Sequence, residues 1–342
     1  MKRIFLIFLI LLMLLPLSAC GDAKESSSRV SAMHTNFTVT AYGKNGDRGI
    51  KAAESVILAL DAACDPNNAT STVYAINHAN GTPVSLSGQL ADMLFTAEDI
   101  YEKTGGSYDL TIHPLVEKWG FTNGQYYIPS ENEITNGLNN LCMDSIVVNK
   151  FPTSGTYSVT LPYYGQFSFA SCARGCAGKY AAEAMKNVGV ESAVISLSGH
   201  VQTIGKKPDG SDWKIAIEDP NKENSWLATV QTGETAIITS GAYQQNFVSN
   251  GKTYHHILNP KSGYPVSNGL VSVTILCEDG TKADCLSTAM YVLGKTAAIR
   301  YWRENGGFDM ILITDTNEIT CTSGLIEKFD LKNPNYSLNY VE

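Results

Sequence analysis

The sequence lacks the clusters of lysine and arginine through which proteins bind nucleic acids or anionic membrane surfaces. Its 342 residues carry 25 Lys and Arg against 33 Asp and Glu, a net charge of -8, so we expect no nucleic-acid partner. The chain also has no internal repeat and no low-complexity tract. Because 44% of its residues are hydrophobic, it can bury a substantial core in one large domain or two closely packed ones.

Three common signatures of nucleotide binding and catalysis are missing as well. The chain has no G-x-G-x-x-G fingerprint, no P-loop and no G-x-S-x-G nucleophile elbow. These motifs carry the phosphate-binding turns and the strained nucleophiles of dehydrogenases, kinases and esterases. The sequence therefore gives no support to those three classes of enzyme.

An aspartate and a threonine occupy a helical spacing late in the chain. The run of Ala, Leu, Met and Val over residues 283–294 predicts a helix, on which Asp284 and Thr288 lie one turn apart near the start. Two oxygen ligands at this spacing suit a hard cation such as Mg²⁺, and an exposed helix start favours phosphate. The alternative is that Asp284 only caps the helix while Thr288 packs, since this pattern is common.

The residues that precede this helix favour a ligand-binding interpretation. Histidine is scarce, with six in the chain, yet His255 and His256 are adjacent and lie within fifty residues of Asp284. A Ser-Gly turn, Ser240-Gly241, lies in the same stretch. We therefore expect residues 239–290 to contribute a functional site.

A second stretch, GGSYDLTIHPLVEKWGF at residues 105–121, also has features of a binding site. Its double glycine lets the backbone approach a ligand closely, and Asp109 follows an aromatic residue. The alternative is that Trp119 and Phe121 belong to the core and Asp109 is a turn residue. This segment alone does not separate the two interpretations.

The remaining patterns predict strands and helices without regular βαβ alternation. This mixture indicates an α+β fold with mixed, largely antiparallel sheets and flanking helices. The expected strands are residues 33–42, 157–161, 166–170, 189–205 with a break at 198–199, 270–276 and 310–314, with a β-hairpin at 207–220. The expected helices are residues 50–63, 86–104, 131–141 and 177–188.

The N-terminus has the pattern of a lipoprotein signal peptide. A basic start, an apolar run and the sequence LSAC predict that residues 1–20 form the signal and that Cys20 becomes the lipidated first residue. A single-span anchor is the alternative, but the run is short for about 30 Å of hydrocarbon. We expect a tether at residues 21–32, a domain at 33–330 and a C-terminal tail at 331–342, outside the cytoplasm on the cell membrane.

Seven further cysteines are irregularly spaced, which makes a poor disulfide framework. We expect most of them to be free thiols. Cys172 and Cys176 are close enough in sequence to pair or to bind a metal. No second Cys/His pair is placed to complete a zinc site with them.

Five ordered motifs resemble the ApbE family, the FAD:protein FMN transferases. They are GGSYDLTIHPLVEKWGF, GVESAVISLSGHVQTIGKKPDGSDWKIAIEDP, ITSGAY, YHHILNPKSGYP and KADCLSTAMYVLG, and the similarity runs from about residue 33 to 325. The resemblance implies an ApbE-like fold and an enzyme that takes FAD, releases AMP and joins FMN through its phosphate to a Ser or Thr of an exported acceptor flavoprotein. Such acceptors are subunits of membrane redox complexes or extracellular reductases, and Mg²⁺ would bridge the pyrophosphate.

The resemblance also assigns roles to individual residues. It implies that His256 is the catalytic base or an orienting group and that Mg²⁺ is held at Gly175, through its backbone carbonyl, and at Asp284, Ser287 and Thr288. The positions that it matches to the FAD site are Met33, Ser107, Tyr108, Asp109, Cys172, Gly178, Gly199, Ser240, Gly241 and His256.

The chain departs from the family pattern at residues 172–180. Where the family has D-L-G-G-I-A-K-G-Y, this chain reads CARGCAGKY, so Cys172 replaces an Asp and Gly178 replaces a Lys. Lys179 is one residue away, which turns its side chain by about 100° on a helix, and Arg174 is another cation that could meet phosphate. Two alternatives remain: an Mg²⁺-dependent FAD pyrophosphatase, and a lipid-anchored FAD-binding protein without catalysis.

Overall fold

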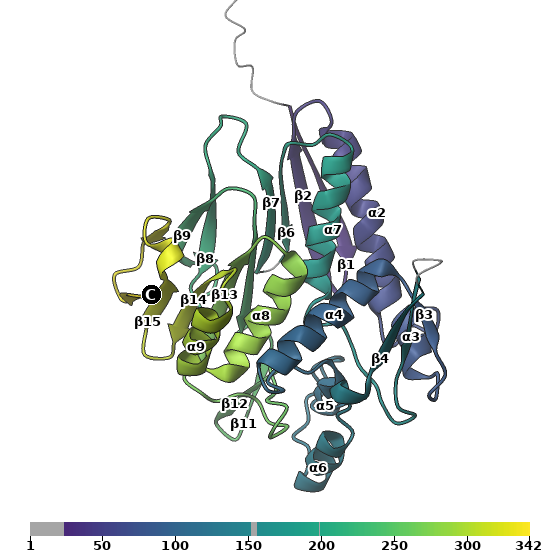
Figure 1. Cartoon of the computed structure of the whole chain (residues 1–342). Coiled ribbons are helices and arrows are strands. Elements are labelled where there is room, and N and C mark those ends of the chain that lie inside the picture. Colours follow the sequence, from purple (N-terminus) through teal and green to yellow (C-terminus); the bar gives the residue numbers. More distant parts are fainter. Residues whose placement is uncertain (1–23, 152–155, 198) are drawn as a thin grey trace, which may run out of the picture.

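A computed structural model describes residues 24–151, 156–197 and 199–342 of the chain. Its centre is a nine-stranded sheet in the order β1-β2-β6-β7-β10-β13-β14-β15-β17, antiparallel throughout except for the last pair (Figure 1). This confirms the predicted α+β fold. The strands are β1 (Glu25–Ala32), β2 (Thr35–Tyr42), β6 (Ser192–Leu197), β7 (His200–Gly205), β10 (Ala236–Gly241), β13 (Leu270–Cys277), β14 (Asp309–Thr314), β15 (Glu318–Thr322) and β17 (Ser337–Val341).

One face of the sheet is covered by helices. α2 packs on β1 and β2, α7 on β7, and α8 on β10 and β13, and α7 and α8 also pack on each other (Figure 1). The buried apolar side chains of these helices and strands form the largest core cluster. The helices are α2 (Gly46–Cys64), α4 (Gly88–Lys103), α7 (Ala173–Asn187), α8 (Gly280–Leu293) and α9 (Lys295–Asn305).

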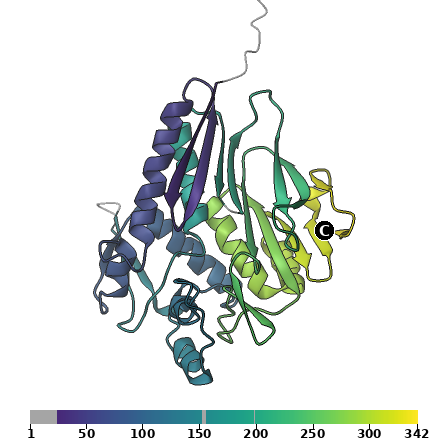
Figure 2. The same ribbon diagram turned by 180° about the vertical axis from the view of Figure 1, so that it is seen from behind.

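A three-stranded sheet, ordered β16-β9-β8, builds a second core. Ile217 and Leu227 of this sheet are buried with Ile237 and Ile311 of the central sheet. Figure 2 shows from behind that β1 and the C-terminal strands lie at opposite edges of the molecule. The strands of the smaller sheet are β8 (Trp213–Glu218), β9 (Trp226–Thr232) and β16 (Phe329–Leu331).

Most of the remaining elements lie below or beside the helical layer in Figure 1. Trp119 and Phe121 are buried there against Leu115, Ile134 and Leu258, in a third core cluster. The alternative that places these two aromatic residues in the core is therefore confirmed. The elements are α3 (Thr72–Asn77), β3 (Val84–Leu86), η2 (Leu110–Ile112), α5 (His113–Lys118), α6 (Glu131–Asn139), η3 (Met143–Ser145), β4 (Val147–Phe151), β5 (Thr156–Thr160), β11 (Asn246–Ser249), β12 (Lys252–His255) and η4 (Ser323–Leu325).

Parts of the predicted tether and of the predicted tail are strands of the central sheet. β1 occupies most of residues 21–32 and pairs with β2 from Glu25 to Ala32. The strand expected from residue 33 starts two residues later, because Met33 and His34 have φ values of 50° and 58° and form the turn between β1 and β2. At the other end, β17 pairs with β15 within the expected tail.

Two further strand predictions are wrong. Residues 166–170 do not form a strand, because the Asn77 side chain donates to Phe167 O at 2.9 Å and accepts from Phe167 N at 3.0 Å, where a neighbouring strand would otherwise bind. Residues 207–220 do not form a hairpin of their own. They supply only β8, which pairs with the later strand β9.

The signal peptide and Cys20 lie outside the described residues, so their assignment stays a prediction. Within residues 24–151, 156–197 and 199–342, no helix is long and apolar enough to cross a membrane. The seven cysteines of the described part are all buried and free, which confirms the expectation of free thiols and shows Cys172 and Cys176 unpaired.

Candidate functional site

Asp284 lies in the second turn of α8 and does not cap the helix. The cap is Asp279, whose side chain accepts from Lys282 N at 3.0 Å. Asp284 is only 4% exposed, and both carboxylate oxygens are hydrogen bonded. Oδ2 accepts from Gly175 N at 2.8 Å, and Oδ1 accepts from His200 Nε2 at 3.0 Å. The capping alternative is therefore wrong, and a buried carboxylate stands at the contact of α7, α8 and β7.

Hydroxyl groups of α8 and β10 lie close to one another and to the backbone of Asp284. Ser240, near the end of β10, has its Oγ 2.8 Å from Ser287 Oγ and 3.3 Å from Thr288 Oγ1. Ser287 Oγ also donates to the backbone oxygen of Asp284 at 2.9 Å. The structure thus brings together Ser240, Asp284, Ser287 and Thr288 as predicted, and Gly241 ends the same strand.

Two glycines permit the close contact between α7 and α8. A Cβ on Gly175 would lie 2.2 Å from Gly280 O and 2.6 Å from Asp284 Cβ, and a Cβ on Gly280 would lie 2.5 Å from Gly175 O. Any side chain at either position would therefore push the helices apart. Gly175 meets Asp284 through its amide, while its carbonyl, the expected metal ligand, faces Gly280.

The oxygen atoms around Asp284 suit Mg²⁺ if other ligands complete its coordination. Within the described residues, no group of three or more His, Cys, Asp or Glu side chains is arranged to hold a metal ion. Mg²⁺ commonly takes only one or two carboxylates and obtains its other ligands from water and substrate phosphates. One carboxylate with neighbouring hydroxyls therefore fits Mg²⁺ when a phosphorylated substrate is also bound.

His256 is a neutral imidazole that lies beside the aromatic ring of Phe121. Its Nδ1–H donates to Gln245 O at 3.2 Å, and its ring centroid is 6.4 Å from that of Phe121. Burial lowers the pKa of His256 to about 4, the Gln245 carbonyl opposes this shift, and electrostatic contributions from His255 and Arg174 add to it. Since Nδ1 carries the proton, Nε2 is the nitrogen that can accept one.

The neighbouring His255 has a structural role. Its Nε2–H donates to Val266 O at 2.8 Å, and its Nδ1 accepts from Ile257 N at 3.3 Å. It is buried, with 6% exposure, at the end of β12. Both ring nitrogens are occupied, so this histidine does not take part in proton transfer.

A small cavity opens beside Asp284, between the first turns of α7 and the strand β7. Arg174, Gly175, Gly178, His200 and Gln202 contribute to its lining. Its volume is about 10 Å³, which is room for about one water molecule. A ligand larger than water therefore needs the surrounding side chains to move.

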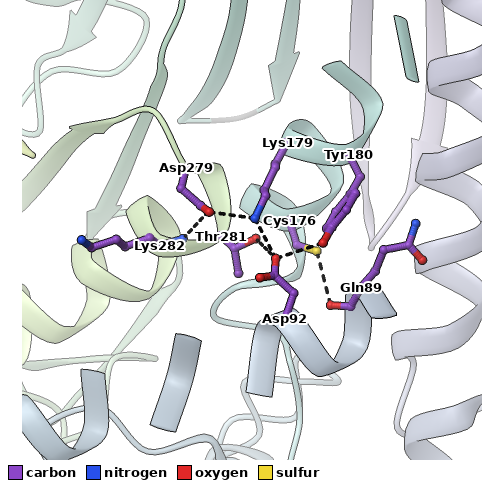
Figure 3. A network of polar contacts seen from close by, with 8 residues as sticks. All are labelled: Gln89, Asp92, Cys176, Lys179, Tyr180, Asp279, Thr281 and Lys282. Carbon is purple, nitrogen blue, oxygen red and sulfur yellow. Dashed lines mark hydrogen bonds and ion pairs between the residues drawn. The ribbon is translucent and has the colours of Figure 1, made fainter. Parts of the chain in front are cut away.

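Lys179 does not point into this cavity but holds three helices together (Figure 3). Its Nζ donates to Asp92 of α4 at 2.8 Å and to Asp279 at 2.7 Å, and Tyr180 and Thr281 also donate to Asp92. Burial alone would lower the pKa of Lys179, but these two hydrogen bonds outweigh it and raise the pKa. Lys179 therefore does not take the place of the lysine that the family has at position 178.

Residues 107–109 do not lie together at one site: Tyr108 lies near Cys285, whereas Asp109 lines a different cavity. Tyr108 is buried, its hydroxyl lies 2.9 Å from Ser171 Oγ, and burial raises its pKa beside the thiols of Cys172 and Cys285. Cys285 follows Asp284, so Tyr108 and Cys172 adjoin the carboxylate site. Burial raises the pKa of Cys172 well above its ordinary value, so this thiol does not replace the charge of an Asp.

Asp109 faces a different cavity. Its Oδ1 accepts from Thr111 N at 2.7 Å and caps η2, and burial raises its pKa. The cavity has a volume of about 300 Å³ and lies between residues 101–109, 141–145 and 260–261. Ser107 donates from Oγ to Thr104 O at 3.0 Å. Asp109 is thus both a turn residue, as the alternative had it, and part of a cavity wall.

The remaining predicted positions lie in turns. Met33 follows β1, and its amide donates to Asp61 of α2 at 2.7 Å. Gly199 joins β6 to β7 with a φ of 78°, which favours glycine, and it immediately precedes His200. His200 and Gln202 were missed by the sequence analysis. Their only signal was the alternation of β7 after this turn, which places positions 200 and 202 on one face.

A helix-flanked, largely antiparallel sheet defines an α+β fold, and comparison with known proteins gives its family. The sequence pattern of the ApbE family matches residues 33–312. The FAD:protein FMN transferase of Haemophilus influenzae is 26% identical over 341 residues, which cover 96% of this chain and 98% of that protein. The Escherichia coli K12 protein of the same name is 29% identical over 286 residues, 80% of each chain. In the crystal structure of the ApbE protein from Thermotoga maritima, 98% of the chain superposes on 88% of this one, with a TM-score of 0.79 and 26% identity.

This chain belongs to the ApbE family. It is accordingly an enzyme of the transferase class.

Proposed function

We propose that the protein transfers FMN from FAD to a Ser or Thr hydroxyl of an exported acceptor protein and releases AMP. Membership of the ApbE family and the names of the relatives support this proposal. The observation that carries it is the buried carboxylate of Asp284, one turn before Thr288 on α8, whose hydroxyl lies 3.3 Å from that of Ser240 on β10. A divalent cation bound there would hold the charged phosphates of a dinucleotide.

The proposed reaction is a displacement at the phosphorus of the FMN half. The acceptor oxygen forms a bond to this phosphorus, and the bond from the phosphorus to the oxygen bridging to AMP breaks. The proton of the acceptor hydroxyl moves to Nε2 of His256, which is neutral because burial lowers its pKa to about 4. AMP leaves with the bridging oxygen. His256 is thus proposed as the catalytic base.

Mg²⁺, held by Asp284 and Thr288, would neutralise charge on the diphosphate. The protein's own contribution at this point is to keep the carboxylate in place, which Gly175 N and His200 Nε2 do through their hydrogen bonds to Asp284. We further propose that Cys20 is lipidated and that the enzyme acts on the outer face of the cell membrane, where exported acceptors reach it.

Incubation of the protein with FAD, Mg²⁺ and a candidate acceptor tests the proposed function. We expect flavin fluorescence on the acceptor band after denaturing electrophoresis, together with an equal amount of AMP. Free FMN with AMP and no labelled acceptor would indicate a pyrophosphatase. Recovery of intact FAD after days with excess Mg²⁺ would indicate a flavin-binding protein without catalysis.

A further inference from the structure

The cavity beside Asp284 contains a cation without a partner. Arg174 lies in the first turn of α7, is half-buried and lines this cavity together with Gly175 and His200. Among residues 24–151, 156–197 and 199–342, the Arg174 side chain forms no hydrogen bond and no ion pair. Charged groups removed from water are ordinarily paired. Its position therefore indicates a place for an anion that comes from outside the chain.

A second residue of the same cavity also lacks a partner. Gln202 is only 7% exposed, and its Nε2 donates to Thr203 O at 3.2 Å. Its Oε1 is buried and has no hydrogen-bond partner in the described part of the chain. An unsatisfied buried acceptor is rare in folded proteins. The cavity thus offers a cation and an acceptor, which suit a ligand with both a phosphate and a hydroxyl or amino group once the surrounding side chains have moved to admit it.

Among the residues that line this cavity, no Lys or Arg other than Arg174 is present. Lys179 is bonded to Asp92 and Asp279 (Figure 3) and does not line the cavity. Gly178 is one helical turn after Arg174, on the same face, and lines the same cavity without filling it. A Cβ on Gly178 would meet only Gln202 Cβ, at 3.4 Å. Because Gly178 has no side chain, it does not fill the space beside Arg174.

Arg174 also acts on the proposed catalytic base. Its charge is close enough to His256 to contribute to the lowered pKa of that imidazole. The positive charge of Arg174 therefore favours the neutral form of this imidazole.

We propose that Arg174 binds the diphosphate of FAD and supplies the positive charge that the protein itself contributes there. This inference rests on the proposed function, because it identifies the anion as the diphosphate of that substrate. A guanidinium pairs with phosphate oxygens through two parallel hydrogen bonds. The start of α7 adds the partial positive charge of a helix N-terminus on the same side.

Binding of FAD and of riboflavin, which has no phosphate, tests this inference. Each flavin is titrated by fluorescence into the full chain and its variants, with Mg²⁺ present and no acceptor. We expect Arg174→Gln to weaken FAD binding about 10- to 100-fold and to leave riboflavin binding unchanged. Arg174→Lys keeps the charge but loses the paired geometry, so its affinity for FAD should lie between those of the wild type and Arg174→Gln.

Lys186→Gln is the matched control, because Lys186 is in the last turn of the same helix and pairs with the exposed Glu234. It removes one positive charge and should leave FAD affinity unchanged. Equal FAD affinity of Arg174→Gln and the wild type would overturn the inference while the proposed function stands. Equal weakening for FAD and riboflavin would also overturn it, since Arg174 would then only support the fold. A wild-type chain that binds no FAD would overturn the proposed function itself.

Discussion

At the scale of single residues, the protonation state of His256 is the feature that most affects the chemistry. An ordinary histidine has a pKa near 6.5 and is largely protonated at pH 5.5. Burial, with smaller contributions from His255 and Arg174, lowers the pKa of His256 to about 4. The imidazole therefore stays neutral, and able to accept a proton, at every pH well above 4.

This shift predicts the acid limb of the pH profile. The rate of FMN transfer, measured as kcat/KM from pH 4 to pH 8, should stay level as the pH falls through 6.5 and should decline only towards pH 4. His256→Gln should lower kcat/KM by about 100- to 10,000-fold, the usual contribution of general base catalysis. A decline centred near pH 6.5 in the wild type would show that His256 is not the base or is not shielded from water.

At the scale of elements, the contact between α7 and α8 positions the carboxylate. Because a Cβ on Gly175 would lie 2.2 Å from Gly280 O, we expect Gly175→Ala to separate the two helices. Overpacking of this kind lowers the free energy of unfolding by about 1 to 3 kcal/mol. The Asp284 carboxylate should move with α8, so activity should fall as well.

Gly178→Ala is the matched control for this prediction, in the same helix and one turn away. Its Cβ would meet Gln202 Cβ at 3.4 Å, an ordinary contact. The change from Gly to Ala in a helix should raise the free energy of unfolding by up to about 1 kcal/mol. Urea unfolding of both variants measures the difference. Equal stability of the two would contradict the close packing at Gly175.

The network of Lys179 joins the starts of α7 and α8 to α4, as Figure 3 shows. Its side chain is 18% exposed, while those of Asp92 and Asp279 are 29% and 39% exposed. We expect Lys179→Met to lower the free energy of unfolding by about 1 to 3 kcal/mol, below the range for fully buried pairs because water screens part of the network. Lys103→Met, which breaks the exposed pair with Asp99, should change it by about 0.5 kcal/mol or less.

The pH dependence of stability provides a second test of the prediction for Lys179→Met. The folded chain raises the pKa of Lys179 above its unfolded value. The network therefore contributes its full stability below a pH of about 10.4, the unfolded pKa of lysine, and loses it as the pH rises through the folded pKa. The stability difference between wild type and Lys179→Met should shrink at high pH, and a constant difference would contradict the ionic origin of the effect.

At the scale of the whole molecule, local patterns were enough to predict the fold class and most helices. The amphipathic runs of α2 and α4 and the apolar run of α8 determine those helices, and five motifs in order indicated the family. The nine-stranded order, with its parallel pair of β15 and β17, was not predictable because strand pairing depends on contacts between distant parts of the sequence. For the same reason the segments expected as tether and tail became strands.

The sequence predicted the site residues that belong to a recognisable motif. It did not predict those that only the tertiary fold brings to the site. Asp284, Thr288 and Ser240 were expected together and are together. His200 was missed because its hydrogen bond to Asp284 joins β7 to α8, 84 residues apart. No local pattern distinguishes a strand histidine with such a partner from a core histidine.

The measurement that tests the account most directly is FMN transfer by Asp284→Asn. Asparagine has nearly the same shape as aspartate but no negative charge to hold Mg²⁺ against the diphosphate. With FAD, Mg²⁺ and an acceptor, the variant should both consume FAD and label the acceptor about 100-fold or more slowly than the wild type. Its melting temperature is measured alongside to show that it is folded. A folded Asp284→Asn variant that consumes FAD at the undiminished wild-type rate would contradict the central claim.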